Sequence, residues 1–160
     1  MIVVSDTSPI NNLAAIGHLQ LLRKLYGQVI IPEAVYSELV SFSVAGAEEV
    51  KTFDWILVRS VDDRELVSSF IDKGLDVGES EAIALAIELE AERILIDETI
   101  GRGVAKEQGL ALTGVVGVLV KAKDCGLINE VKSLLDRLRD PVNFWISNAL
   151  YQRVLEAAEE

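Results

Sequence analysis

The 160-residue sequence has one cysteine, Cys125, and one histidine, His18. A single cysteine excludes an intramolecular disulfide and a cysteine zinc site, and a single histidine disfavours chemistry that needs several imidazoles. No apolar run approaches the ~20 residues that span a bilayer. The longest, 110–120, is interrupted by Thr113 and two glycines. The first residues do not resemble a signal peptide. We therefore expect a cytoplasmic protein with no membrane partner.

Basic residues are also scarce, with 15 Lys and Arg against 26 Asp and Glu, giving a formal net charge of −11. A field of this sign repels phosphate, which excludes a basic protein that coats nucleic acid. Hydrophobic residues make up 50% of the chain and charged residues 26%, as in a soluble globular protein. The length fits one domain with a sizeable core, and no repeat or linker divides it. We predict a single domain over residues 1–160.

Short apolar runs alternate with helical patterns along the chain. Strands are predicted at 2–5, 28–31, 56–58, 93–96 and 110–112. Helices are predicted at 10–15, 18–25, 33–40, 45–52, 62–72 (with Leu66, Phe70 and Ile71 inward), 79–92, 100–108, 115–125, 129–139 and 148–159. Residues 74–78 are expected to form a loop. Most strands are apolar throughout, which is typical of strands covered on both faces. The pattern predicts a three-layer α/β/α sandwich with a central, mainly parallel sheet.

Two of the predicted strands run directly into an acid, Asp6 after the first and Asp97 after the fourth. Ligands of open α/β sheets gather beyond the carboxyl ends of the strands. Either acid alone would be explained as a helix N-cap. Two acids at equivalent positions favour a functional site.

Further acids come from predicted helices. Glu38 lies beside the apolar face of 33–40, where a solvated role is the common alternative. Glu79 and Glu81 both open the helix 79–92, where the helix dipole favours carboxylates. Because the two are two residues apart, they point to different sides. Glu79 lies above small and apolar residues, so we favour it for the site and expect Glu81 to be a solvated acid at the helix start.

Several carboxylates without histidine form a donor set for hard divalent cations such as Mg²⁺ and Mn²⁺. Carboxylates crowded together are costly unless a cation neutralises them. A cation held in this way lowers the pKa of a water molecule and stabilises charge at a phosphorus centre. The sequence thus has the residues for metal-dependent phosphodiester hydrolysis.

The acidic motifs, taken in order, resemble those of PIN domains. They are DTSP at 6–9, PEAVYSEL at 32–39, GESEAIALA at 78–86, DETIGR at 97–102 and TGVVGVLVKAK at 113–123. The resemblance covers nearly the whole chain and is nearest to a PIN-like group of bacteria and archaea. It implies the α/β/α fold and a Mg²⁺- or Mn²⁺-dependent endoribonuclease, often the toxin of a VapC-type toxin–antitoxin pair. The implied partners are an RNA substrate, an antitoxin protein and a second copy in a homodimer.

The family's acids carry over residue by residue. The catalytic and metal-binding residues implied are Asp6, Glu38, Glu79 and Asp97. The family's polar residue after the first acid corresponds to Thr7 or Ser8. The chain departs from the family in having Glu79 where Asp is common. Its fourth acid is ambiguous between Asp97 and Glu98, and the Thr that usually ends that strand is absent.

Charge along the chain is uneven. Residues 76–100 hold eight acids and one base, whereas 101–139 hold seven bases and four acids. Both stretches fit solvated helix faces. They also fit an acidic metal pocket beside a basic rim for the phosphate backbone, with Arg102 and Lys106 as the first candidates and Lys121 and Lys123 as the second. The aromatic pair Phe144 and Trp145 is expected to serve as a core or dimer contact, with stacking on bases as the alternative.

Two other functions compete with the nuclease. In the first, the acids of a catalytically degenerate PIN-like binding module hold the basic side chain of a partner. In the second, an Asp nucleophile hydrolyses a small phosphate ester. That chemistry usually has a second Asp two residues after the first, and Ser8 stands at that position here. A metal titration distinguishes the nuclease from the binding module.

Overall fold

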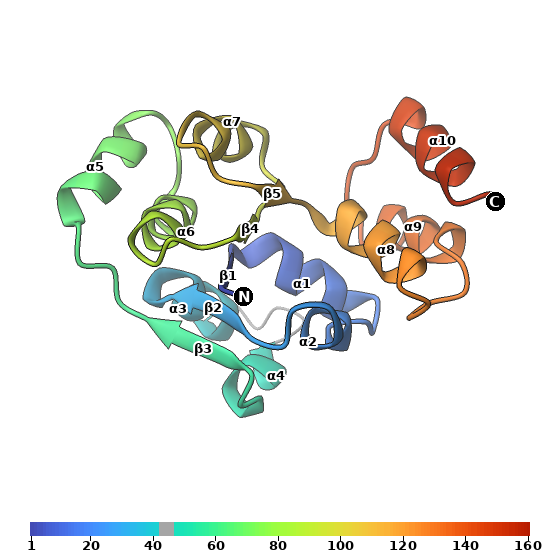
Figure 1. Ribbon diagram of the computed structural model, residues 1–160, viewed down its shortest axis with the longest axis horizontal. Helices are drawn as coiled ribbons and strands as arrows, with labels where there is room; N and C mark the ends of the chain where they lie inside the picture. The colour runs from blue at the N-terminus through green and yellow to red at the C-terminus, as the bar shows by residue number, and fades with distance from the viewer. Residues whose placement is uncertain (42–46) are drawn as a thin grey trace.

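A computed structural model describes residues 1–41 and 47–160. Its centre is a five-stranded, entirely parallel sheet (Figure 1). In spatial order β3-β2-β1-β4-β5, the strands are Ile56–Arg59, Val29–Pro32, Val3–Ser5, Arg93–Leu95 and Leu112–Thr113. The chain builds β1, β2 and β3 outward on one side and then returns to place β4 on the other side of β1. The expected parallel sheet is confirmed.

Helices follow or connect these strands. They are α1 (Thr7–Ala15), α2 (Gln20–Tyr26), α3 (Glu33–Ser41), α4 (Ala47–Thr52), α5 (Arg64–Asp72), α6 (Val77–Glu88), α7 (Thr99–Glu107), α8 (Val115–Asp124), α9 (Lys132–Arg139) and α10 (Asn148–Ala157). All of the helices predicted from the sequence are present. The first two residues of the helix predicted at 45–52, Ala45 and Gly46, lie outside the described residues.

Alternation along the strands divides the core into two layers. Val3 of β1 and Leu95 of β4 face a core shared with α1, α2 and α8. Their neighbours Val4 and Ile94 face the opposite core, built with α5, α6 and α7. All four side chains have no exposed surface. The three-layer α/β/α sandwich is therefore confirmed, and the central strands β1 and β4 are buried on both faces.

The boundaries of α6 and β5 differ from those predicted. Helix α6 begins at Val77, inside the expected loop, because Asp76 caps it. It ends at Glu88 rather than near Glu92, because Glu90 takes a positive φ of 52°. Strand β5 begins only at Leu112, since the Leu110 N–H is used to close α7 on the carbonyl of Ala105.

The inward face of α5 is also corrected. Val67 and Phe70 are its buried residues, and Leu66 packs partly against them. Ile71, which we expected to point inward, is 39% exposed. The helix begins two residues later than predicted, at Arg64, after the Asp63 cap accepts a hydrogen bond from the Leu66 N–H. The side of α5 that packs in the core with α6 is therefore the one that carries Val67 and Phe70.

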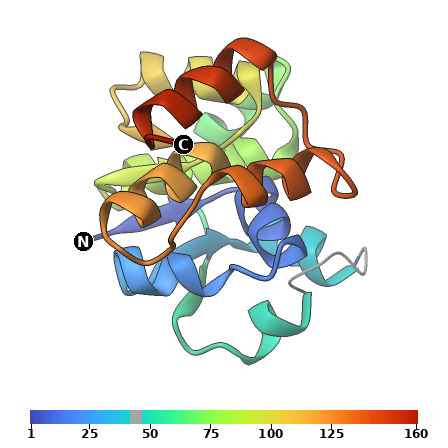
Figure 2. The same ribbon diagram turned by 90° about the vertical axis from the view of Figure 1, so that its right-hand side faces the viewer.

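The last three helices pack together at one side of the domain (Figures 1 and 2). Tyr151 and Leu155 of α10 are buried in the same core as α8 and α9, so they are packing residues within this chain. The Glu160 carboxylate accepts hydrogen bonds from the backbone N–H groups of Val131 and Lys132 and pairs with Lys123 at 2.7 Å. Within residues 1–41 and 47–160, no helix is long and apolar enough to cross a membrane.

Candidate functional site: an acidic edge of the sheet

The candidate site lies where the direction of the sheet switches, between β1 and β4. The chain leaves β1 toward β2 but enters β4 on the opposite side, which opens a crevice at the carboxyl ends of these two strands. Asp6 follows β1, and its N–H donates to the carbonyl of Leu95 in β4 at 2.9 Å. Asp97 follows β4 two residues further on. The two acids predicted from strand ends therefore flank one crevice.

Asp97 is held on two sides. Its Oδ1 accepts the N–H of Val115, the first residue of α8, at 2.9 Å. Its Oδ2 accepts the hydroxyl of Ser8 at 3.2 Å. Asn12, one turn further along α1, in turn donates to the Ser8 Oγ at 2.9 Å. The carboxylate is thereby fixed between the beginnings of α1 and α8.

Glu38 reaches the site from α3, whose buried face is formed by Val35 and Leu39. The Thr7 hydroxyl donates to the Glu38 carboxylate. On the other side lies Gly78 of α6, where a Cβ atom would be only 3.0 Å from Glu38 Oε1. Thr7 and Ser8, which the family resemblance implied as supporting residues, thus each bind one of the acids.

Glu79 lies in the first turn of α6 and forms a reciprocal cap with Asp76. The Glu79 N–H donates to Asp76 Oδ1 at 2.8 Å, and the Asp76 N–H points back to Glu79 Oε1 at 3.4 Å. The other oxygen of Glu79 faces α7, where a Cβ on Gly101 would lie 2.6 Å from Oε2. The side chain of Glu79 is 8% exposed.

Burial is the main cause that raises the pKa of three of these acids, Asp6, Glu79 and Asp97. Burial raises the pKa of Asp6 to about 7, helped by the nearby carboxylates of Asp76, Glu38 and Asp97 and opposed by a backbone hydrogen bond. Burial likewise raises the pKa of Glu79 to about 8, with Asp76 and Asp6 adding to the effect. The pKa of Asp97 is also raised by burial, although its hydrogen bonds and Arg102 act in the other direction. The four predicted acids therefore share one electrostatic environment.

The donor set fits a hard divalent cation in chemistry and in burial. The carboxylates of Glu38, Glu79 and Asp97 each pack against the backbone of a glycine, at 78, 101 and 114, where a Cβ would clash with a carboxylate oxygen. In the described part of the chain, however, no group of three or more acidic, His or Cys side chains is arranged to hold a metal ion. Glu38 points to Thr7, and Asp97 to Ser8 and Val115, so a shared ion requires these side chains to turn toward it.

The expectation for Glu81 is wrong. Instead of being solvated, it is 6% exposed. Its carboxylate pairs with Arg64 of α5 at 2.9 Å and accepts the N–H of Ala34, in the first turn of α3, at 3.0 Å. The unpaired N–H groups at a helix start give a buried carboxylate its partners. Glu81 thus joins three helices and stands outside the acidic crevice.

The structure separates the two candidates for the fourth acid. Asp97 is half-buried in the crevice, whereas Glu98 is exposed and caps α7 with its backbone alone. The two first candidates for a basic rim, Arg102 and Lys106, also differ in position. Arg102 donates to the Ile96 carbonyl at 2.8 Å and lines a cavity with Asp97. Lys106 does not line that cavity but a second hollow, which Arg102 also lines.

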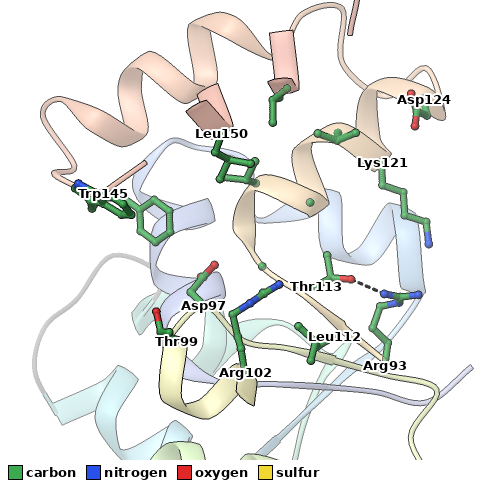
Figure 3. A pocket seen from close by; sticks show the side chains of 16 residues that line it. Arg93, Asp97, Thr99, Arg102, Leu112, Thr113, Lys121, Asp124, Trp145 and Leu150 are labelled. Atoms are coloured by element: carbon green, nitrogen blue, oxygen red, sulfur yellow. Dashed lines mark hydrogen bonds between the residues drawn. The ribbon is translucent and has the colours of Figure 1, made fainter. Parts of the chain in front are cut away.

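The cavity beside Asp97 has a volume of about 670 Å³ and lies over the edge strand β5, under α8 and α10 (Figure 3). Asp97 and Trp145 stand at one side of it, and Arg93 and Lys121 at the other, with Arg102 between. Of the roles expected for Trp145, a core contact is wrong, because its side chain is 81% exposed, whereas a dimer contact or stacking on bases stays a prediction. Of the second pair of rim candidates, Lys121 lines this cavity, whereas Lys123 is bound to Glu160.

Sequence reasoning missed several residues of the site. Asp76 was assigned to a loop, although the pattern of an acid followed three positions later by Glu79 is a helix-capping signal. Asn12 gave no signal, because its role depends on Ser8 one turn earlier. The glycines at 78, 101 and 114 gave no signal in the sequence either, because only the fold brings carboxylates against them.

The fold and the acidic crevice agree with the comparison to known families. The chain belongs to the PIN-domain family, because the sequence model of that domain matches residues 2–160. Members of this family are generally nucleases that use divalent metal ions.

A solved structure similar to this chain is a PilT N-terminus domain protein of the hyperthermophilic archaeon Sulfolobus solfataricus P2. The TM-score is 0.56 and the sequence identity 21%, with 76% of this chain and 93% of that chain covered. Identity at that level supports the likeness of fold alone. No curated protein matches the chain.

Proposed function

We propose that the protein is a metal-dependent endoribonuclease in which Asp6, Glu38, Glu79 and Asp97 bind Mg²⁺ or Mn²⁺. The observation that carries the proposal is the convergence of four carboxylates from four elements on one crevice, two of them with a pKa raised to about 7 and about 8. A fold stabilises such a cluster poorly unless a cation neutralises it. Membership of the PIN-domain family supports the same conclusion.

When bound, a divalent ion supplies a Lewis acid that lowers the pKa of water and neutralises charge at the scissile phosphate. The chain's own groups would position the reactants. Thr7 would orient Glu38, and Ser8 with the Val115 N–H would orient Asp97. Arg102, five residues after Asp97 and beside it in the cavity, would meet a non-bridging phosphate oxygen.

The test is cleavage of single-stranded RNA with Mn²⁺ and with EDTA. We expect wild-type protein to cleave only with Mn²⁺, and Asp6→Asn and Asp97→Asn to lose cleavage while keeping the wild-type circular dichroism spectrum. The matched control is Glu98→Gln, which alters the exposed neighbour of Asp97 and should retain activity. Cleavage by Asp6→Asn at the wild-type rate would refute the assignment.

The biological part of the proposal is that the protein acts as a toxin with a cognate antitoxin, and as a homodimer. This part rests on family resemblance. Induced expression should arrest growth with the wild-type chain but not with Asp6→Asn, and co-expression of a small protein encoded by a neighbouring reading frame should relieve the arrest. Sedimentation of the purified protein tests the dimer. Arrest by the inactive variant would contradict the toxin role.

One observation favours the degenerate binding module instead. No three carboxylates in the parts of the chain described here are arranged around a common ion position. In that alternative, a partner arginine would take the place of the cation between Asp6 and Asp97. Addition of millimolar Mn²⁺ distinguishes the two, because only the metal-binding protein gains stability from it.

A further inference from the structure

We propose that the cavity between β5, α8 and α10 is a subsite for one unpaired nucleotide of the RNA, with its base stacked on Trp145. The inference rests on the proposed nuclease function and makes it more specific, because it places one nucleotide of the substrate in this cavity. It also assigns a role to an aromatic side chain that family membership does not.

Size and position support a nucleotide as the occupant. The cavity volume of about 670 Å³ lies within the range of about 300–1,000 Å³ typical of small-ligand sites. Of the four acids proposed to bind the metal ion, Asp97 lines this cavity. A nucleotide seated there would be a neighbour of the scissile phosphate.

Charge supports a phosphate-bearing ligand. Within a chain of net charge −11, this cavity gathers three cations, Arg93, Arg102 and Lys121, against two acids. The three are fixed in place. Arg93 donates to the Thr113 hydroxyl at 2.5 Å, Arg102 to the Ile96 carbonyl at 2.8 Å, and the Lys121 Nζ lies 5.1 Å from the centroid of the Tyr26 ring. A polynucleotide entering at Asp97 would therefore find cations along its path across β5 (Figure 3).

Trp145 supplies an exposed aromatic face on a fixed backbone. The segment around it is anchored on both sides, since the Phe144 N–H donates to the Leu138 carbonyl at 2.7 Å and the Ile146 carbonyl accepts from Arg139 at 3.0 Å. Ile146 itself is buried. An indole that is 81% exposed on such a segment is a stacking platform and not a frayed end.

The geometry selects single strands. A base stacks on an indole only when its face is free, and in a duplex both faces are covered by neighbouring base pairs. Stacking is tolerant of sequence because every base has a π-face. The subsite therefore predicts a preference for unpaired RNA with little preference for a particular base.

The experiment compares two short single-stranded oligonucleotides of equal length, one of RNA and one with abasic sugars. Affinities are measured in EDTA, where cleavage is blocked, by fluorescence anisotropy. We expect Trp145→Ala to weaken RNA binding by about tenfold. Trp145→Phe, which retains a stacking ring, should bind near wild type. On the abasic strand the wild type and Trp145→Ala should bind equally.

A phosphate-contact variant completes the design. Lys121→Ala should weaken the binding of both oligonucleotides by the same factor and lower the salt dependence of binding, because it removes a charge and leaves the stacking ring in place. The exposed indole also reports directly, since RNA should quench its emission while the buried Trp55, 4% exposed, stays shielded. Emission from Trp145 that RNA leaves unchanged would oppose the subsite.

The outcomes separate this subsite from the nuclease itself. If the protein cleaves RNA with Mn²⁺ but Trp145→Ala binds RNA as wild type does, or loses equal affinity for the abasic strand, the subsite is overturned and the nuclease stands. A protein that neither binds nor cleaves RNA overturns both. If Trp145→Ala converts a dimer to a monomer with RNA binding unchanged, Trp145 is a protein contact and the subsite is wrong.

Discussion

Gly101 and Glu79 meet so closely that a Cβ on Gly101 would lie 2.6 Å from Glu79 Oε2 and 2.8 Å from the Ile96 Cδ1. The contact joins the start of α7 to the start of α6 and leaves the carboxylate lying against backbone. Gly78 and Gly114 stand in the same relation to Glu38 and Asp97. Close approach of backbone to a functional group is one of the established uses of glycine.

This packing predicts opposite effects for two glycines of one helix. Gly101→Ala should displace Glu79, cost about 1–3 kcal/mol of unfolding free energy through overpacking, and lower RNA cleavage. Gly103→Ala, two residues further along α7, meets nothing within 4 Å and should be neutral or stabilising by up to about 1 kcal/mol. Urea unfolding and a cleavage assay measure both effects. Equal stability of the two variants would contradict the contact.

Glu79 and Glu81 provide a second matched pair. In metal-free protein near pH 8, Glu79→Gln should stabilise the fold, because it removes a charge disfavoured by burial and by Asp76. Glu81→Gln should destabilise it by about 1–3 kcal/mol, since it weakens the pairing with Arg64. Urea unfolding of both variants in EDTA checks the signs. A loss of stability in Glu79→Gln equal to that in Glu81→Gln would show that both are structural acids.

The pH dependence of stability follows from Asp6. Its pKa is about 7 in the folded protein and about 4 in an unfolded chain, so the folded state binds its proton more tightly. The stability that this tighter proton binding contributes is fully present below about pH 4 and is lost as the pH rises toward about 7. The free energy of unfolding of Asp6→Asn, relative to that of the wild type, should therefore increase by on the order of 1 kcal/mol per pH unit between about pH 4 and 7.

The measurement is urea unfolding of both proteins in EDTA at several pH values. The comparison cancels the contributions of the other acids that the two chains share. A difference in unfolding free energy that does not change with pH would mean that Asp6 is ionised in the folded protein throughout. The raised pKa of Asp6, which comes mainly from burial, would then be wrong.

The sequence predicted those parts of the structure that depend on local pattern. The apolar runs predicted the parallel sheet, and the acids after two of them, Asp6 and Asp97, lie at the carboxyl ends of the neighbouring strands β1 and β4. Relations between distant segments left no local pattern. Glu81 resembled any acid in a first helical turn, because its partners Arg64 and Ala34 lie 17 and 47 residues away. Trp145 was expected to be a core or dimer contact because indoles are mostly buried, and only its place in the fold shows that it is exposed in this chain.

The most direct test of the central claim is the thermal stability of the protein as Mn²⁺ is added near neutral pH. If the four acids form one cation site, the wild-type melting temperature should rise with Mn²⁺ concentration. At a concentration a hundred times the Kd, the bound ion should add about 2.7 kcal/mol to the free energy of unfolding. Asp6→Asn and Asp97→Asn should lose this rise, while Glu98→Gln keeps it. A wild-type melting temperature unchanged by millimolar Mn²⁺, or an equal rise in Asp6→Asn, would contradict the account.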